Sequence, residues 1–589
     1  MERRKSALTP EQYARPIIAL SRRYASNSTF PGNNYVGLGE WVLQDRSLFN
    51  TTKSEDERVL FASQSEKPHD LVVVYNSGAR KWEMQQYSQE QHQAFSLDTT
   101  VPARGSGQLV FIRGFISPSW VTALGSKYNI DPEYFRQHMD FLSASVDRHA
   151  YSFPSLSSSS NNIIRLCVST LVHRDDFGGQ DIQSQRSHES AQLATYRMHS
   201  LGSNRVSCGD SIVREYSTIC ASFSVMEQWI SISISKTDRG WAVIAWMDQG
   251  RPLEESPPGP WLSHIESKAI ALPVLQSHHK MAFRTTTNRL DSDANASARF
   301  QQSAAVLPLQ YDSLIALVDL ARRAPQDPLH MCIPLFAHAA FSEVQFLNLM
   351  GSKICAQTDA IVEGVSANTL ETFQYFGKIL NRHAQQLKDT LRALQKLVER
   401  SDPAFDENRS GYMTKPGTAV RPGPGADLAR QVETKDAQIF RGTASLDGSF
   451  TAKGLLEDYE QLLDRCIELS KTCNRGITLA MNKATIEESR KAIEQSERLK
   501  KLTILATLFI PLNFSSSLFG MNIEILGQGH LAFWWFFVLC VPITLLAYIF
   551  YLWDFQALRN QAGRLWRMCY SLRSNRRAKW IEKDGDHVV

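Results

Sequence analysis

A face of small and polar side chains runs through an uncharged stretch of the chain. Residues 502–519 carry no charge and are mostly apolar. As a helix they span about 27 Å at about 1.5 Å per residue, close to the hydrocarbon core of a bilayer at about 30 Å. Polar side chains in lipid need a partner or water, so several copies with this face turned inward would enclose a polar path. Together with the preceding turns, the face comprises Ser496, Leu499, Thr503, Ala506, Ile510, Asn513 and Ser517.

The polar residues of this face have two interpretations. The serines between residues 515 and 517 either line a pore or bond back to the backbone of their own helix. Asn513 either lines the pore or bridges neighbouring helices. The sequence favours neither interpretation for the serines, and we prefer the pore for Asn513.

A second apolar run, residues 532–553, follows a loop at residues 520–531 that is too short to fold alone. The two runs predict a helical hairpin in a bilayer. Lys500 and Lys501 precede the hairpin and a basic tail at residues 554–589 follows it, whereas the loop has no Lys or Arg. The positive-inside rule then predicts both termini in the cytosol and the loop outside. Two buried core helices of a soluble protein are the alternative.

The loop begins with the tripeptide Gly520-Met521-Asn522. At the exit of the first of two C-terminal helices, behind a long charged helix, this tripeptide resembles the signature of the CorA-type divalent-cation transporters. The resemblance is specific over residues 450–553 and diffuse before them. Two further tripeptides also resemble that family, Leu502-Thr503-Ile504 and Ile510-Pro511-Leu512.

The resemblance implies that Gly520, Met521 and Asn522 form the selectivity entrance of a homopentamer. The amide oxygen of Asn522 is a hard acceptor, and a ring of such oxygens can hold hydrated Mg²⁺ without stripping its water. Gly520 permits a tight turn, and Met521 is expected to pack against it. Glu524 either attracts cations to the mouth or is a solvated loop charge. Bacterial relatives carry a second acidic residue in this loop, so the preferred ion is less certain.

The leading functional hypothesis is a Mg²⁺ transporter or channel that conducts down the electrochemical gradient. No phosphate-binding loop and no catalytic set is recognisable, so neither an ATP-driven pump nor an enzyme is expected. Transport of Zn²⁺, Co²⁺ or Ni²⁺, as in the ZntB-like branch, is the first alternative. A membrane-anchored sensor or scaffold without conduction is the second. The plasma membrane is the expected location, with an organelle membrane as the alternative.

Composition excludes several other classes. The 589 residues carry 64 Lys and Arg against 60 Asp and Glu, a net charge of +4 that does not indicate a nucleic-acid partner. The nine cysteines are scattered and predict neither a disulfide framework nor a zinc ribbon. No resident cofactor is expected, and Mg²⁺ enters as the transported ion. The expected partners are therefore further copies of the chain, the lipid bilayer and divalent cations.

The remainder of the chain predicts an α/β or α+β cytosolic domain and a helical stalk. Short strands are expected at residues 71–75, 109–113, 163–168, 230–235 and 241–247, with another starting at 222. Ser117-Pro118 and Asp131-Pro132 predict helix starts. Residues 172–210 are expected to be loops. The predicted segments are a polar, loosely ordered extension at 1–65, the α/β domain at 66–300, a helical region at 301–500, the hairpin at 501–553 and the tail at 554–589.

Within the helical region we expect a mobile loop at residues 401–450 and a long helix at 452–500. Nothing ends this helix at Lys501, so we favour a continuous helix into the membrane over one that stops near residue 500. A charged, solvated face is the preferred interpretation of its acidic residues, and a regulatory Mg²⁺ site between subunits is the alternative. These residues are Glu457, Asp458, Glu460, Asp464 and Glu468.

Overall fold

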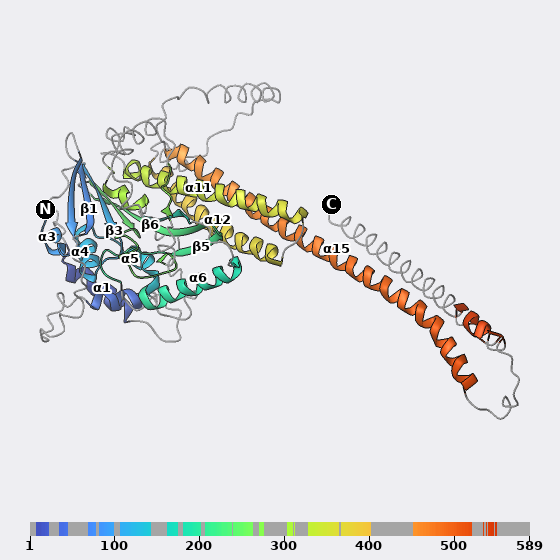
Figure 1. The fold of residues 1–589 in the computed structure, drawn as a ribbon. Coiled ribbons are helices and arrows are strands. Elements are labelled where there is room, and N and C mark those ends of the chain that lie inside the picture. The colour runs from blue at the N-terminus through green and yellow to red at the C-terminus, as the bar shows by residue number, and fades with distance from the viewer. Residues whose placement is uncertain are drawn as a thin grey trace, which may run out of the picture. The chain divides into compact units, whose positions relative to one another are not determined.

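The structure is a computed structural model, and it divides the chain into two compact units, Met1–Ala480 and Met481–Val589 (Figure 1). Each unit is described by itself. The residues described are 8–22, 35–44, 69–77, 82–98, 106–142, 162–174, 181–201, 206–237, 240–262, 270–275, 303–309, 311, 328–363, 367–401, 452–520, 534, 537–538, 540–546 and 548–549.

The first unit is built on an eight-stranded mixed sheet in the order β2-β1-β3-β7-β6-β4-β8, with β5 also paired to β6. β3 and β7 run parallel, with Val110 opposite Ile244, and the other recorded pairs are antiparallel. The strands are β1 (Asp70–Ser77), β2 (Trp82–Ser88), β3 (Ser106–Arg113), β4 (Ile163–His173), β5 (Glu215–Cys220), β6 (Phe223–Thr237), β7 (Gly240–Met247) and β8 (Ile270–Ala271).

Helices cover both faces of this sheet (Figure 1). In β1, Val73 and Tyr75 join one core, whereas Val72 and Val74 join the other. The first core also contains residues of α11 (Pro328–Glu363), α12 (Ala367–Ser401) and α15 (Ala452–Gly520). The second core contains residues of α1 (Pro10–Ser21), α2 (Val36–Leu43), α3 (His92–Leu97), α4 (Pro118–Tyr128), α5 (Pro132–His138) and α6 (Ile182–Tyr196). The α/β prediction for this part of the chain is therefore confirmed.

Both predicted helix starts are confirmed. Ser117 caps α4 and accepts a hydrogen bond from the backbone N–H of Trp120, with Pro118 in the first turn. Asp131 caps α5 through the backbone N–H of Glu133, and Pro132 follows it. Each cap satisfies a donor that a helix N-terminus otherwise leaves unpaired.

Part of the expected polar extension at residues 1–65 is folded, which corrects that interpretation. Thr9 and Gln12 form a reciprocal capping box at the start of α1. Tyr13 and Ile17 lie one turn apart on this helix and are buried in the second core. α2 joins the same core, so the polar composition of the segment hid two short amphipathic helices.

The loop expected at residues 172–210 also contains a helix, α6, followed by a π-helical turn at Arg197–Leu201. Its sequence lacks an apolar stripe because charged side chains occupy buried positions. Arg186 donates to the backbone oxygens of Thr218 and Ile219 at 3.0 and 2.9 Å. These contacts replace the apolar pattern by which a buried helix face is usually recognised.

The two strand segments expected from residue 222 and at 230–235 form one long strand, β6. The alternation of Ile and Ser predicted a half-buried strand, but Ser231 and Ser233 are buried as well as Ile230 and Ile232. Ser231 Oγ lies 2.8 Å from His138 Nδ1, so a polar partner lies on the face that was expected to meet water. Helices on both faces of the sheet explain the difference.

Two 3₁₀ segments and two long helices also belong to the described part of the first unit. The 3₁₀ segments are Asp140–Leu142 and Ser303–Leu309, and α11 and α12 supply the predicted helical region. The expected mobile loop at residues 401–450 lies outside the described residues, apart from Ser401 at the end of α12.

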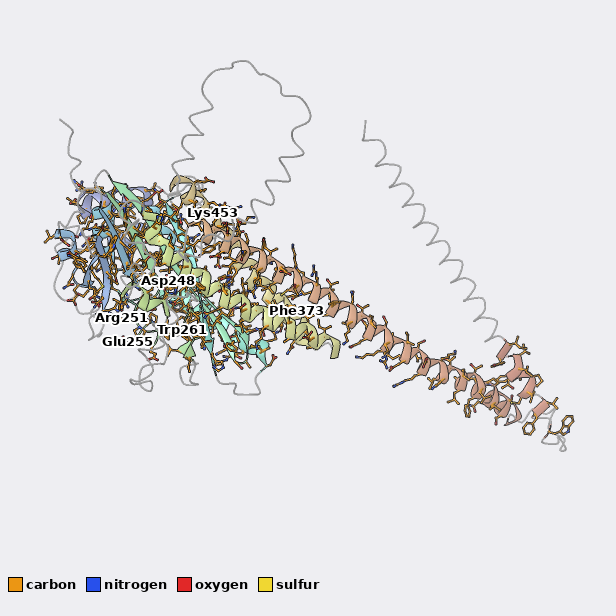
Figure 2. The ribbon with its side chains drawn as sticks, turned by 90° about the horizontal axis from the view of Figure 1, so that it is seen from above. Asp248, Arg251, Glu255, Trp261, Phe373 and Lys453 are labelled. Atoms are coloured by element: carbon orange, nitrogen blue, oxygen red, sulfur yellow. The ribbon has the colours of Figure 1, made fainter. Side chains whose placement is uncertain are left out.

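Gly476 of α15 lies against Phe373 of α12, which Figure 2 labels. A Cβ atom at Gly476 would be 2.7 Å from two ring carbons of Phe373. Phe373 is fully buried and cannot move away easily. The glycine that interrupts the long helix therefore permits close contact between the two helices.

We expect Gly476→Leu to destabilise the protein by about 3 kcal/mol through overpacking. Gly377→Ala in α12 is the matched control. Its added methyl meets no atom within 4 Å, so it should stabilise the helix by about 0.5 to 1 kcal/mol. Thermal unfolding of both variants measures the effect, and a neutral Gly476→Leu would contradict the close contact.

Candidate functional site

The predicted pore face lies entirely on α15, which is one continuous helix from Ala452 to Gly520. The helix passes through Lys500 and Lys501 without interruption, so the expectation of a continuous helix is confirmed. The alternative of a helix that ends near residue 500 is wrong.

The seven residues of the predicted pore face share one exposed side of α15. Leu499 is 63% exposed and Ile510 is 67% exposed, although both are large and apolar. Thr503 Oγ donates to the backbone oxygen of Leu499 at 2.9 Å, as hydroxyls on apolar helices commonly do. Ser496, Ala506, Asn513 and Ser517 are also exposed.

A different side of α15 lies near the second predicted segment, within the second unit. Ile504, Thr507 and Leu508 line a groove together with residues of the segment 541–548. At 3.6 residues per turn this side is roughly 120° away from the predicted pore face. Pro511 and Ser515 share the groove side and are buried. The predicted pore face is therefore the side that the second segment leaves uncovered.

The Ser515 hydroxyl separates the two interpretations of the serines. It is fully buried and has no hydrogen-bond partner among the described residues. The backbone bond expected in the second interpretation is therefore not formed by this residue. It also lies away from the predicted pore face, in contrast to Ser517.

Gly520 is the last residue of α15, so the tripeptide motif begins where the helix ends. Met521, Asn522 and Glu524 lie outside the described residues. Of the second predicted span, residues 534, 537–538, 540–546 and 548–549 are described, and all of them are helical.

Within the described ranges, no helix combines the length and the hydropathy required to cross a membrane.

The acidic residues of the stalk, from Glu457 to Glu468, are exposed, in agreement with a solvated face. Asp458 has a raised pKa because of partial burial and the neighbouring Glu457. Over the part of the chain that the structure describes, no group of three or more His, Cys, Asp or Glu side chains is placed to hold a metal ion. A regulatory site on this helix stays a proposal that needs a second subunit.

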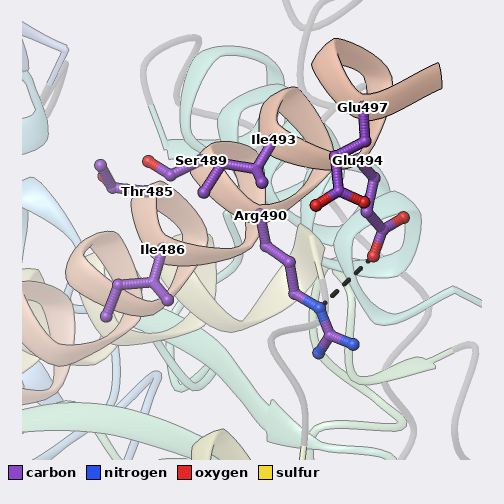
Figure 3. Close-up of a pocket in the computed structure, with 7 residues that line it drawn as sticks. All are labelled: Thr485, Ile486, Ser489, Arg490, Ile493, Glu494 and Glu497. Carbon is purple, nitrogen blue, oxygen red and sulfur yellow. Dashed lines mark ion pairs between the residues drawn. The ribbon is translucent and has the colours of Figure 1, made fainter. Parts of the chain in front are cut away.

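Further along α15, the second unit has a shallow pocket of about 400 Å³ whose lining comes from this helix alone (Figure 3). Ile486 and Ile493, two turns apart, are 67% and 61% exposed. Arg490 Nε lies 3.5 Å from Glu494 Oε1, and both side chains are largely solvated, so this ion pair contributes little. The remaining lining residues are Thr485, Ser489 and Glu497.

A buried charged cluster in the first unit joins the sheet to the helices that cover it. His383 of α12 lies between two carboxylates, with Nδ1 3.0 Å from Glu343 of α11 and Nε2 3.2 Å from Glu227 of β6. Arg382 forms a further ion pair with Glu227. The His383 ring stacks on Phe346 with a centroid distance of 3.9 Å. Both ring nitrogens face carboxylates, so the cluster acts as a structural clamp.

No pattern in the sequence indicates this clamp. Arg382 and His383 follow the apolar positions of a helix and look like part of its polar face. Glu227 lies in a strand, and the residues beside it in the sequence do not indicate that its charge is buried. The four side chains come together only because α11 and α12 pack against the sheet next to β6. They are Glu227, Glu343, Arg382 and His383.

The clamp predicts that stability falls as the pH rises above neutral. Burial alone would lower the pKa of His383, but Glu343 and Glu227 outweigh it and raise the pKa to about 10. A raised pKa means that the stabilisation is complete below the ordinary value of 6.5 and is lost as the pH rises through about 10. We expect the difference in Tm between the protein and His383→Gln to narrow from pH 6.5 to pH 9.5. A constant difference would exclude a protonated clamp.

Acid has a separate effect on the same cluster. Burial would raise the pKa of Glu227, but His383 and Arg382 outweigh it and hold the pKa well below its ordinary value. The stabilisation that the ionised Glu227 provides is therefore present above about pH 4.5 and is lost as the pH falls below that value.

Comparison with known proteins finds similarity at the C-terminal side of the chain. Residues 427–553 match the family described as "CorA-like Mg2+ transporter protein". A segment of 84 residues is 29% identical to the magnesium transporter ALR1 of Saccharomyces cerevisiae, which is 14% of this chain and 10% of that protein. The chain thus matches only a small part of that relative's length.

The structure of the CorA magnesium transporter from Methanocaldococcus jannaschii aligns with 82% of this chain and 96% of its own, at 10% identity and a TM-score of 0.32. That score is too low to support an argument about the fold. The family match includes the predicted pore face, the end of α15 and the tripeptide motif. The resemblance predicted from Gly520-Met521-Asn522 is therefore confirmed over residues 427–553, which match the model of that family.

Proposed function

We propose that this protein conducts divalent metal cations, with Mg²⁺ as the preferred ion, through a membrane pore lined by the C-terminal part of α15. The observation that carries the proposal is the course of this helix. It keeps the predicted pore face uncovered from Ser496 to Ser517 and ends at Gly520 of the tripeptide motif. The family match and the similarity to a magnesium transporter support transport of divalent cations. A transporter family also agrees with the expectation that the chain is not an enzyme.

The proposal requires several copies of the chain, since one helix cannot enclose a path. Four large apolar side chains of α15 are exposed in a single chain. Leu499 and Ile510 lie on the proposed pore face, and Ile486 and Ile493 lie nearer the start of the helix. Exposed apolar side chains at regular helical spacing indicate a covering partner. We propose a homopentamer, in which Asn522 rings the outer mouth and the chain crosses the membrane twice with both termini in the cytosol. The plasma membrane is the proposed location.

The membrane potential can drive this transport without ATP. A potential of 100 mV contributes about 4.6 kcal/mol for a divalent ion, at about 2.3 kcal/mol per charge. Glu524 is proposed to attract cations to the mouth by its charge.

Flux of Mg²⁺ into proteoliposomes that contain the purified chain tests the function. We expect uptake that follows the imposed potential and that Zn²⁺, Co²⁺ and Ni²⁺ inhibit only weakly. Uptake of Zn²⁺ in preference to Mg²⁺ would favour the ZntB-like alternative. No flux of any divalent ion by an assembled protein would favour the sensor or scaffold.

A further inference from the structure

The second unit contains a groove of about 390 Å³ between α15 and the segment 541–548. In Figure 1 the described part of this segment lies beside the C-terminal end of α15. The volume falls within the 300 to 1,000 Å³ that is typical of small-molecule sites. The lining residues are Ile504, Thr507, Leu508, Val541, Thr544, Leu545 and Tyr548.

The groove presents an apolar surface with no charged side chain. Its two threonine hydroxyls are bonded back to their own helices. Thr507 Oγ donates to the backbone oxygen of Thr503 at 2.8 Å, and Thr544 Oγ donates to that of Val541 at 3.1 Å. Their methyl groups, the aliphatic side chains and the ring of Tyr548 remain to meet an occupant. A hydrocarbon chain therefore suits the groove, and a polar ligand does not.

Basic residues lie at one end of this groove. Lys500 and Lys501 are one turn before Ile504, and at 3.6 residues per turn they flank the side of α15 that bears the groove. The stretch from 497 to 501 has one acidic residue, Glu497, and three basic residues, Arg498, Lys500 and Lys501. All four side chains are exposed. The excess positive charge is complementary to an anionic headgroup at the level where a membrane interface would begin.

We propose that the groove binds an acyl chain of an anionic glycerophospholipid whose phosphate contacts Lys500 and Lys501. The proposal rests on the membrane placement in the proposed function. It adds a lipid partner, which the site selects by the charge of the headgroup. A neutral lipid can fill the groove but gains nothing from the two lysines. A helix of a second copy is the competing occupant.

Retention of lipid by the purified full chain tests the headgroup contact. The protein is solubilised from vesicles of equal phosphatidylglycerol and phosphatidylcholine, and bound lipid is measured by mass spectrometry. We expect phosphatidylglycerol to be enriched on the protein. Lys500→Gln with Lys501→Gln should reduce this preference by about 30-fold, which corresponds to about 2 kcal/mol for two lysines. Lys491→Gln is the control and should leave the preference unchanged, because this exposed lysine lies nine residues before Lys500 on α15, away from the groove.

Two neighbouring leucines test the groove itself. Leu545 lines the groove and Leu546 does not, although they are exposed to almost the same extent, at 53% and 54%. With a phosphatidylglycerol that carries a photoactivatable acyl chain, we expect crosslinks within 504–508 and 541–548. Leu545→Trp should remove most of these crosslinks and Leu546→Trp should keep them. Equal effects of the two substitutions would overturn the proposal.

Separate measurements distinguish a second copy in the groove from failure of the proposed function. Efficient disulfide formation between Thr507→Cys side chains of two copies would show that a second copy fills the groove, and this would overturn the lipid assignment. Extraction of membranes with alkaline carbonate and Mg²⁺ flux are measured on the same preparations. A protein that is released by carbonate refutes the membrane placement, whereas a membrane-embedded, conducting protein without lipid preference refutes only the lipid site.

Discussion

Asn522→Ala is expected to reduce selective Mg²⁺ flux by at least about 100-fold while the protein still folds and assembles. The substitution removes an amide oxygen from each copy at the proposed outer mouth. Mg²⁺ dehydrates reluctantly, so loss of the oxygens that hold its hydration shell removes selective entry. Flux in proteoliposomes gives the measurement, and size-exclusion chromatography verifies assembly.

The matched control is Asn513→Ala, which lies two turns inside α15 on the predicted pore face, where the side chain is exposed. It removes the same amide from the wall of the proposed pore, and we expect a smaller loss of flux. Competition with Zn²⁺ should change with Asn522→Ala and stay nearly constant with Asn513→Ala. Parental flux and ion preference in Asn522→Ala would remove this residue from the selectivity entrance.

His383→Leu is expected to destabilise the first unit by about 3 to 5 kcal/mol, because it leaves buried carboxylates without their counter-charge. Glu227 keeps Arg382, but Glu343 loses the partner that lies 3.0 Å away. The leucine fills most of the space of the His383 side chain, so the lost stability comes mainly from the missing positive charge. A decrease in Tm of about 3 to 5 °C is expected for a unit of this size.

Two further variants separate charge from packing. Adding Glu343→Gln to His383→Leu should recover part of the lost stability, since it removes the unpaired charge. His188→Leu is the control, because His188 is exposed on α6 and bonds only to Gln192 in the recorded contacts. It should change the free energy of unfolding by less than about 0.5 kcal/mol. If the double variant is as unstable as the sum of its single variants, the two residues do not act as a pair.

Local rules predicted the elements that depend on short-range chemistry. Ser117-Pro118 and Asp131-Pro132 each specify a helix start through a side chain and a proline, and both are found. The absence of a break at Lys501 correctly predicted a continuous α15. The tripeptide at Gly520 predicted a family that the comparison confirms.

Features that depend on the tertiary environment were not predictable in the same way. α6 buries Arg186 and Glu189 where a helix usually buries apolar residues, so its periodicity is absent. The serines of β6 are buried because helices cover both sheet faces, which the strand's own alternation cannot show. The clamp around His383 joins residues from three elements that are far apart in the chain. For the candidate site, the pore face on α15 stays a prediction, and the groove on the other side of the helix was not predicted.

The parallel contact between β3 and β7 has a consequence for the synthesis of this protein. β3 can pair with β1 as soon as both strands have emerged, but its other edge stays open until β7 is made. At about 5 to 20 residues per second, that interval is on the order of ten seconds. During this time the nascent chain presents an unpaired edge rich in Val, Ile and Phe, which is a template for aggregation. Chaperone occupancy on ribosome-bound chains should therefore rise after β3 emerges and decrease once residue 247 has left the ribosome.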